Sequence, residues 1–180
     1  MKNYSKIAGF LIIFALAFLI YLPAVKGTFH FDDFHHIVNN PAVSEYKGLW
    51  YYFSHPESFS FLGKPTLYRP ITMLSFAFNY MLFNTRASCW LIFNILLHSL
   101  NCGLLFLLLL KWRRDFWQAL LAGLFWAGFA IFNQPINYLS ERSTLFAVCF
   151  VLIALIFDWD WVEKKKGIRE IYLFLALVIF

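Results

Sequence analysis

The sequence has little charge and little cysteine for a chain of 180 residues. Asp, Glu, Lys and Arg make up only 14% of it, whereas soluble domains carry about a quarter. The three cysteines, at positions 89, 102 and 149, lie in apolar runs without any CxxC pair, which is typical of small buried side chains. Internal repeats and low-complexity tracts are absent. These absences point away from a soluble domain and from cysteine chemistry.

What the sequence has in excess is apolar and aromatic side chains. Hydrophobic residues make up 61%, Phe alone occurs 23 times, and the mean hydropathy is +0.64. This composition predicts an integral membrane protein. The net charge of +5 therefore predicts no nucleic-acid partner, because Lys and Arg gather on the cytoplasmic side of membrane proteins.

Apolar runs predict an all-α, polytopic membrane protein with several spanning helices. A span needs about 20 apolar residues, and a run of 10–14 residues is too short to cross. The predicted spans are 7–25, 88–110, 116–133, 144–161 and 171–180. The last run stops after about half a bilayer, so we interpret residues 1–180 as the N-terminal part of a longer membrane domain. The run at 71–83 is short and predicts a helix lying along the membrane surface.

Basic clusters predict the orientation of these helices. Lys2 and Lys6 precede the first span, KWRR occupies 111–114, and EKKKGIR occupies 163–169. All three clusters fall on one side if 71–83 does not span. The N-terminus is then cytoplasmic, and residues 26–86 form a long first outer loop that carries interfacial helices.

The outer loop opens with TFHFDDFHHIVNNP at 28–41, where two acids follow the first span. Phenylalanines around Asp32 and Asp33 predict raised carboxyl pKa values and hence a base at the membrane surface. Asp33 is favoured as this base, and Asp32 as a partner for a metal ion or the acceptor. Solvated acids at a helix exit are the alternative. The nearby histidines match no zinc spacing, so no cofactor is assigned. A divalent ion held by both aspartates and a substrate phosphate stays open.

Five further polar residues occur near the predicted helix ends or inside a span. Arg69 and Arg142 are candidates for binding phosphate, with a solvated or snorkelling side chain as the alternative. Asn94, His98 and Asn101 recur at the spacing of one helical face. Such a face must turn toward other helices, so hydrogen bonding between helices is favoured there over a role in a substrate pathway.

Four motifs in the same order resemble one known family. They are FHFDDFHHIVNNPAV, YRPITMLSFAFNYMLF, FNILLHSLN and NYLSERSTLFAVCFVLIAL, and together they cover about residues 5–160. The sequence resembles the N-terminal membrane half of the transmembrane and tetratricopeptide-repeat proteins, which belong to the GT-C glycosyltransferase superfamily. The resemblance implies a GT-C-like fold and transfer of a sugar from a polyprenyl- or dolichyl-phosphate donor to a hydroxyl acceptor.

The resemblance also implies roles for particular residues. Asp32 and Asp33 match the position of the expected base in the first outer loop, and Arg142 matches a basic residue that opens the fourth span. Animal members resemble protein O-mannosyltransferases acting on Ser or Thr. For this protein the resemblance implies a place in a bacterial cell membrane or an endoplasmic reticulum membrane. Two positions depart from the family pattern, Phe129-Ala130 in place of His-Pro and Asn133-Gln134 in place of Thr-Glu.

These departures keep other functions open. One alternative is a scaffold without catalytic activity or a degenerate relative, and another is a transferase that modifies a glycolipid or a cell-wall polymer. The resemblance places the tetratricopeptide repeats beyond residue 180, so we expect activity in the full-length protein and not in this part alone.

Overall fold

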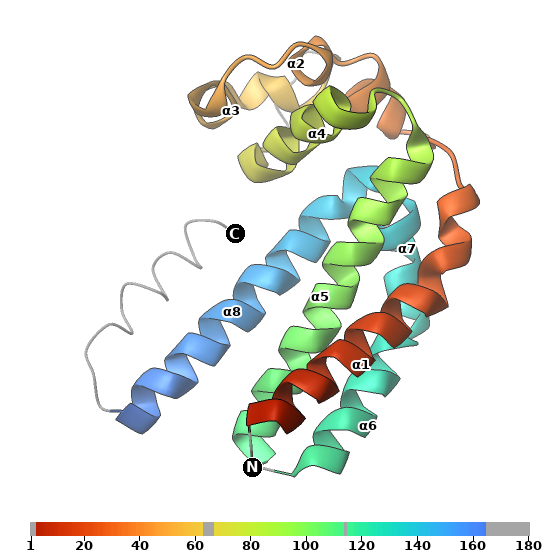
Figure 1. Ribbon diagram of the computed structural model, residues 1–180. Coiled ribbons are helices and arrows are strands. Elements are labelled where there is room, and N and C mark those ends of the chain that lie inside the picture. Colours follow the sequence, from red (N-terminus) through yellow and green to blue (C-terminus); the bar gives the residue numbers. More distant parts are fainter. Residues whose placement is uncertain (1–2, 63–66, 114, 165–180) are drawn as a thin grey trace. The chain divides into compact units, whose positions relative to one another are not determined.

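A computed structural model describes residues 3–62, 67–113 and 115–164, and every regular element among them is helical (Figure 1). This confirms the predicted all-α class. In chain order the elements are α1 (Asn3–Tyr21), η1 (Leu22–Lys26), η2 (Phe34–Val38), α2 (Pro41–Ser44), α3 (Leu49–Ser54), η3 (Pro56–Phe59), α4 (Pro70–Phe83), α5 (Ala87–Arg113), α6 (Phe116–Ala127), η4 (Ala130–Phe132), α7 (Asn133–Asn137), η5 (Leu139–Glu141) and α8 (Arg142–Lys164).

Three described helical segments are long and apolar enough to cross a membrane. They are Tyr4–Lys26, Ala87–Trp112 and Leu139–Asp160. A fourth crossing is formed by Phe116–Ala127 and Ala130–Asn137 if this pair, bent by 46°, is one span. Helix α4 has 14 residues and is shorter than these spans. The predicted run at 171–180 lies outside the described residues. The protein is therefore a polytopic α-helical membrane protein.

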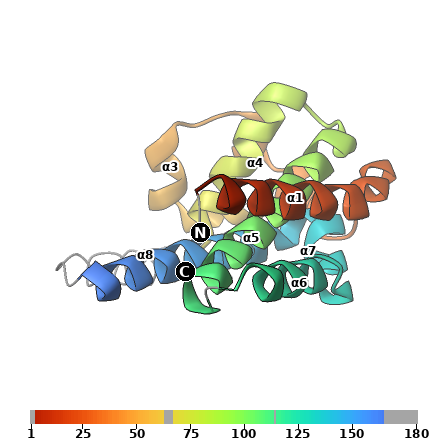
Figure 2. The same ribbon diagram turned by 60° about the horizontal axis from the view of Figure 1, so that its bottom comes forward.

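The chain divides into two compact units, which are described separately. The first is built from the described parts of residues 1–22, 95–131 and 144–180, so it holds the long helices. Figures 1 and 2 show α1, α5 and α6 side by side, and all three contribute to one core. The buried residues of this core are Ile13, Ala17, Cys102, Phe106, Leu110, Ala119 and Ala127.

Small residues allow these helices to approach closely. A Cβ at Gly123 would lie 2.5 Å from Ile13 Cδ1, and a Cβ at Gly103 would lie 2.4 Å from Phe10 Cε2. Neither distance leaves room for a methyl group. Lipid offers no hydrophobic drive for helix association, so close packing of this kind is a main source of stability in a membrane.

The second unit comprises residues 23–94 and 132–143 and contains the short helices. Asn40 organises its turn from η2 into α2. The Asn40 side chain accepts a hydrogen bond from the Ala42 N–H at 3.0 Å, and Pro41 stands in the first turn, where its missing N–H costs nothing. The Asn40 amide also donates to the carbonyls of His36 and Ser58 at 3.1 and 2.9 Å. One buried side chain thus connects η2, α2 and η3.

Candidate active site

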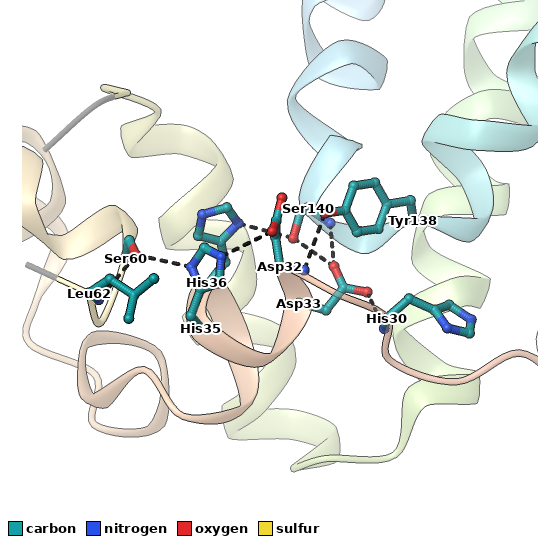
Figure 3. A network of polar contacts seen from close by, with 9 residues as sticks. All are labelled: His30, Asp32, Asp33, His35, His36, Ser60, Leu62, Tyr138 and Ser140. Carbon is teal, nitrogen blue, oxygen red and sulfur yellow. Dashed lines mark hydrogen bonds and ion pairs between the residues drawn. The ribbon is translucent and has the colours of Figure 1, made fainter. Parts of the chain in front are cut away.

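Asp33 is fully buried, and both of its carboxylate oxygens accept hydrogen bonds (Figure 3). Oδ1 accepts from the backbone N–H of Ser140 at 2.8 Å and from the Ser140 hydroxyl at 2.6 Å. Oδ2 accepts from the backbone N–H of His30 at 3.0 Å. Ser140 lies in η5, directly before α8, so the carboxylate ties the segment between η1 and η2 to the start of that helix. This geometry makes Asp33 an anchor of the local fold.

Asp32 points the other way and is accessible. Its side chain is 55% exposed, and Oδ1 lies 3.1 Å from His35 Nε2. Its backbone N–H donates to the Tyr138 hydroxyl at 3.3 Å. Hydrogen bonding by Tyr138, and secondarily by His35, lowers the pKa of Asp32, although partial burial opposes this. The prediction of a raised pKa at Asp32 is therefore wrong in direction, because polar partners outweigh the neighbouring phenylalanines.

His36 completes the buried part of this network. Its Nδ1 lies 3.1 Å from Ser140 Oγ. The single hydroxyl proton of Ser140 is directed at Asp33, so Oγ must accept from His36, which assigns the proton of His36 to Nδ1. Burial lowers the pKa of His36 to about 4, and the ring packs on Phe59 with centroids 4.2 Å apart. His36 is accordingly neutral at physiological pH.

Arg69 lies beside this network. It immediately precedes α4, and its Nη1 donates to the Ser140 carbonyl at 3.5 Å, the long limit of a hydrogen bond. The guanidinium sits 5.4 Å from the centre of the Phe59 ring. The side chain is half-buried. A guanidinium with one weak hydrogen bond keeps most of its donors for a ligand.

Arg142 is fully buried and its donors are engaged by the protein. Nε donates to Asn94 Oδ1 at 2.7 Å, Nη1 to Ser75 Oγ at 3.1 Å, and Nη2 to the Trp90 carbonyl at 3.3 Å. Three rings also surround it, those of Phe76, Trp90 and Phe93, with centroids at 4.8, 5.6 and 4.6 Å. Arg142 therefore holds α4, α5 and the start of α8 together, and a phosphate would have to displace these contacts to reach it.

The polar residues at 94, 98 and 101 are all buried. Asn94 belongs to the second unit, where its amide donates to the carbonyls of Pro135 and Ile136, each at 3.2 Å. His98 and Asn101 belong to the first unit. His98 Nε2 lies 3.4 Å from the Ala127 carbonyl, and the Asn101 amide donates to the Leu145 carbonyl at 2.9 Å. All three side chains thus contact other segments of their own unit through hydrogen bonds.

The two aspartates do not form a ready cation site. Asp33 is directed at N–H and O–H donors, and within the described part of the chain no group of three or more His, Cys, Asp or Glu could hold a metal ion. Both pairs that depart from the family pattern, Phe129-Ala130 and Asn133-Gln134, are exposed.

Sequence reasoning missed Tyr138 and Ser140, which both contact the aspartates. Both belong to the NYLSERS motif, which also contains Arg142, and this shared motif was the available signal.

The accessible polar cluster and the apolar helices define the class: an integral membrane protein with an acidic, histidine- and tyrosine-lined site in a short-helix unit. The chain is 32% identical to the protein O-mannosyl-transferase F38B6.6 of Caenorhabditis elegans over 156 residues, which is 83% of this chain and 23% of that protein. It is 25% identical to the protein O-mannosyl-transferase Tmtc1 of Drosophila melanogaster over 183 aligned positions, which is 97% of this chain and 21% of that protein. No protein-family model and no solved structure matches the chain.

These two matches confirm the family prediction: the chain is a relative of the transmembrane and tetratricopeptide-repeat proteins. It spans less than a quarter of the length of the curated relatives that it matches.

Proposed function

We propose that this chain is part of a membrane glycosyltransferase that moves a sugar from a polyprenyl-phosphate donor to a hydroxyl acceptor, with protein Ser or Thr as the favoured acceptor. The relatives' names support the sugar transfer and the protein acceptor. The observation that carries the proposal is Asp32, an accessible carboxylate a few residues beyond the first membrane span. A lipid-linked donor presents its sugar phosphate at this level while its tail stays in the bilayer.

Asp32 is the proposed base in this reaction. The acceptor oxygen attacks the anomeric carbon, the bond from that carbon to the phosphate oxygen breaks, and the lipid phosphate leaves with the electron pair. The acceptor proton passes to Asp32. A carboxylate with a lowered pKa is a weak base, which suits a transition state in which the sugar becomes oxocarbenium-like before the acceptor loses its proton.

The remaining cluster assists this step. The hydroxyl of Tyr138 and the ring of His35 orient the Asp32 carboxylate, and the guanidinium of Arg69 stabilises the charge that develops on the leaving phosphate. Asp33, through Ser140, fixes the loop that presents Asp32. We therefore propose Asp32 as the base in place of Asp33, which the sequence favoured.

A scaffold without catalytic activity is the second candidate. Arg142 and Asn94 favour it, because both are buried and each forms three hydrogen bonds to the protein, as structural residues do. A folded full-length protein that transfers no sugar from any polyprenyl-phosphate donor would support this alternative.

The test is transfer of labelled sugar from polyprenyl phosphate by membranes that contain the full-length protein. Asp32→Asn should lower transfer by about 10²–10⁴-fold, the usual contribution of a general base. Glu57→Gln is the matched control, because Glu57 is an exposed acid of the same unit. Transfer by Asp32→Asn at the level of Glu57→Gln, with equal expression, would remove Asp32 from the reaction.

The same proposal includes a cytoplasmic N-terminus and an outer location for residues 26–86. Glu57→Cys, in a background without the three native cysteines, should react with an impermeant thiol reagent on the outer face. Lys165→Cys, which follows the last described residues, should react only after the membrane is opened. Reaction of Lys165→Cys in sealed membranes of known orientation would overturn this topology.

A further inference from the structure

A second candidate binding site lies away from the Asp32 cluster, in the same unit. A cavity of about 540 Å³ occurs where the segment after α2 meets the last turn of α4 and the turn into α5. Ser44, Tyr46 and Arg86 contribute polar groups to it. Met81, Leu82 and Phe83, from the end of α4, contribute apolar walls. The cavity therefore combines one cation and hydroxyl groups with an apolar surface.

Arg86 is the charged group of this cavity and is available for a ligand. Its side chain is exposed, and its guanidinium forms no hydrogen bond or ion pair with any residue that the structure describes. This distinguishes it from Arg142, whose guanidinium donates three hydrogen bonds to the protein, and from Arg69, which contacts Ser140. A free guanidinium beside hydroxyls is suited to a phosphate, which it binds through two parallel hydrogen bonds.

The position of Arg86 along the chain places this cation at the level of lipid headgroups. Arg86 immediately precedes the spanning segment Ala87–Trp112. Side chains at the end of a span lie where the hydrocarbon core gives way to phosphate groups. The apolar residues at the end of α4 are also accessible, with Met81 60% and Leu82 53% exposed. An acyl or prenyl chain could therefore cover them while its phosphate meets Arg86.

The turn that carries Arg86 is fixed in place. Asn84 ends α4 with φ +52° and ψ −139°, a conformation that residues other than glycine rarely adopt. The Asn84 carbonyl accepts a hydrogen bond from Trp90 Nε1 at 2.8 Å, and its N–H donates to the Tyr80 carbonyl at 2.7 Å. A strained turn held by such contacts pre-organises the neighbouring residue for binding.

We propose that this cavity binds a lipid that carries a phosphate group. The phosphate is held by Arg86 with the hydroxyls of Ser44 and Tyr46, and the apolar tail lies along Met81, Leu82 and Phe83. This site is separate from the Asp32 cluster and does not rest on the proposed transfer reaction.

The experiment measures binding to purified full-length protein in neutral detergent by native mass spectrometry or thermophoresis. The three probes are farnesyl phosphate, farnesol with the same tail but no phosphate, and inorganic phosphate without a tail. Farnesyl phosphate should bind at least tenfold more tightly than either of the other two, because the cavity offers partners for both parts of the molecule. Equal binding of inorganic phosphate would overturn the lipid assignment, and equal binding of farnesol would overturn the phosphate assignment.

Two variants locate the binding. Arg86→Gln should weaken binding of farnesyl phosphate about tenfold or more, and Ser44→Trp, which fills the cavity from an exposed position and keeps the charge, should also weaken it. Lys26→Gln is the control, because Lys26 is an exposed cation at the end of the first span and lies outside the cavity. Equal losses in Arg86→Gln and Lys26→Gln would reduce the effect to general surface charge and refute the site. Unchanged binding in Arg86→Gln would refute it as well.

Discussion

Replacing Asp33 with Asn tests whether this acid anchors the fold or takes part in chemistry. The carboxylate accepts three hydrogen bonds, two from Ser140 and one from the His30 N–H. Asn keeps one acceptor oxygen, so its NH₂ group must face either the His30 donor or the Ser140 donors. One unsatisfied donor, together with the loss of charge from the remaining bonds, predicts a destabilisation of about 2–4 kcal/mol.

Asp32→Asn is the matched comparison, because it makes the same chemical change one residue away. The Asp32 side chain is largely exposed and its contact with His35 is a surface pair, so this change should cost only about 0–1 kcal/mol. The assays are thermal unfolding of the full-length protein in detergent and sugar transfer per folded molecule. We expect Asp33→Asn to lower the unfolding temperature with transfer per folded molecule largely kept, and Asp32→Asn to do the reverse.

The opposite pattern would refute the anchor role. Asp33→Asn with a wild-type unfolding temperature and transfer lowered by two or more powers of ten would make Asp33 the base. If Asp33→Asn does not fold, Ser140→Ala is a milder change that removes one of the three hydrogen bonds. An unfolding temperature unaltered by Ser140→Ala would also contradict the anchor.

Three further predictions concern stability. In the folded protein His36 has a pKa of about 4, below its ordinary value of 6.5, so the unfolded chain takes up the proton first as the pH falls. Lowering the pH from 7 to 5 should therefore reduce the free energy of unfolding of the wild type by about 2 kcal/mol. The variant His36→Asn, which keeps a donor toward Ser140, should not show this loss. Arg142→Lys should cost about 3 kcal/mol, because an ammonium cannot reproduce the forked hydrogen bonds of the buried guanidinium; an unfolding temperature equal to wild type would contradict this. Asn84→Gly should stabilise the folded protein by about 1 kcal/mol, because glycine adopts the positive φ of this position without strain. Asn39→Gly, at φ −99°, should not stabilise it, and equal effects of the two changes in thermal unfolding would contradict the strain at Asn84.

The helical architecture could be predicted because lipid imposes it on any sufficiently long apolar run. A backbone in hydrocarbon must satisfy its own hydrogen bonds, so the runs near 7–25 and 88–110 had to be helices. The structure extends them to Tyr4–Lys26 and Ala87–Trp112, because helix ends at a membrane surface carry polar residues that hydropathy alone does not count. The bend between Phe116–Ala127 and Ala130–Asn137 was not predicted, since the apolar run continues through it.

The sequence brings Asp32 and Asp33 together as candidates but does not show which of them is accessible, and the reason is geometric. The side chains of adjacent residues in a turn point in different directions. The direction of each depends on backbone angles that cannot be read from the neighbouring residues. Asp32 and Asp33 look equivalent in the sequence, yet the turn that follows Phe31, with its φ of +42°, leaves Asp32 exposed and Asp33 buried against Ser140. The partner that makes this difference is 107 positions away along the chain. A local motif can therefore show that an acid belongs to the site, but only the long-range contact shows which acid is left free to meet a substrate.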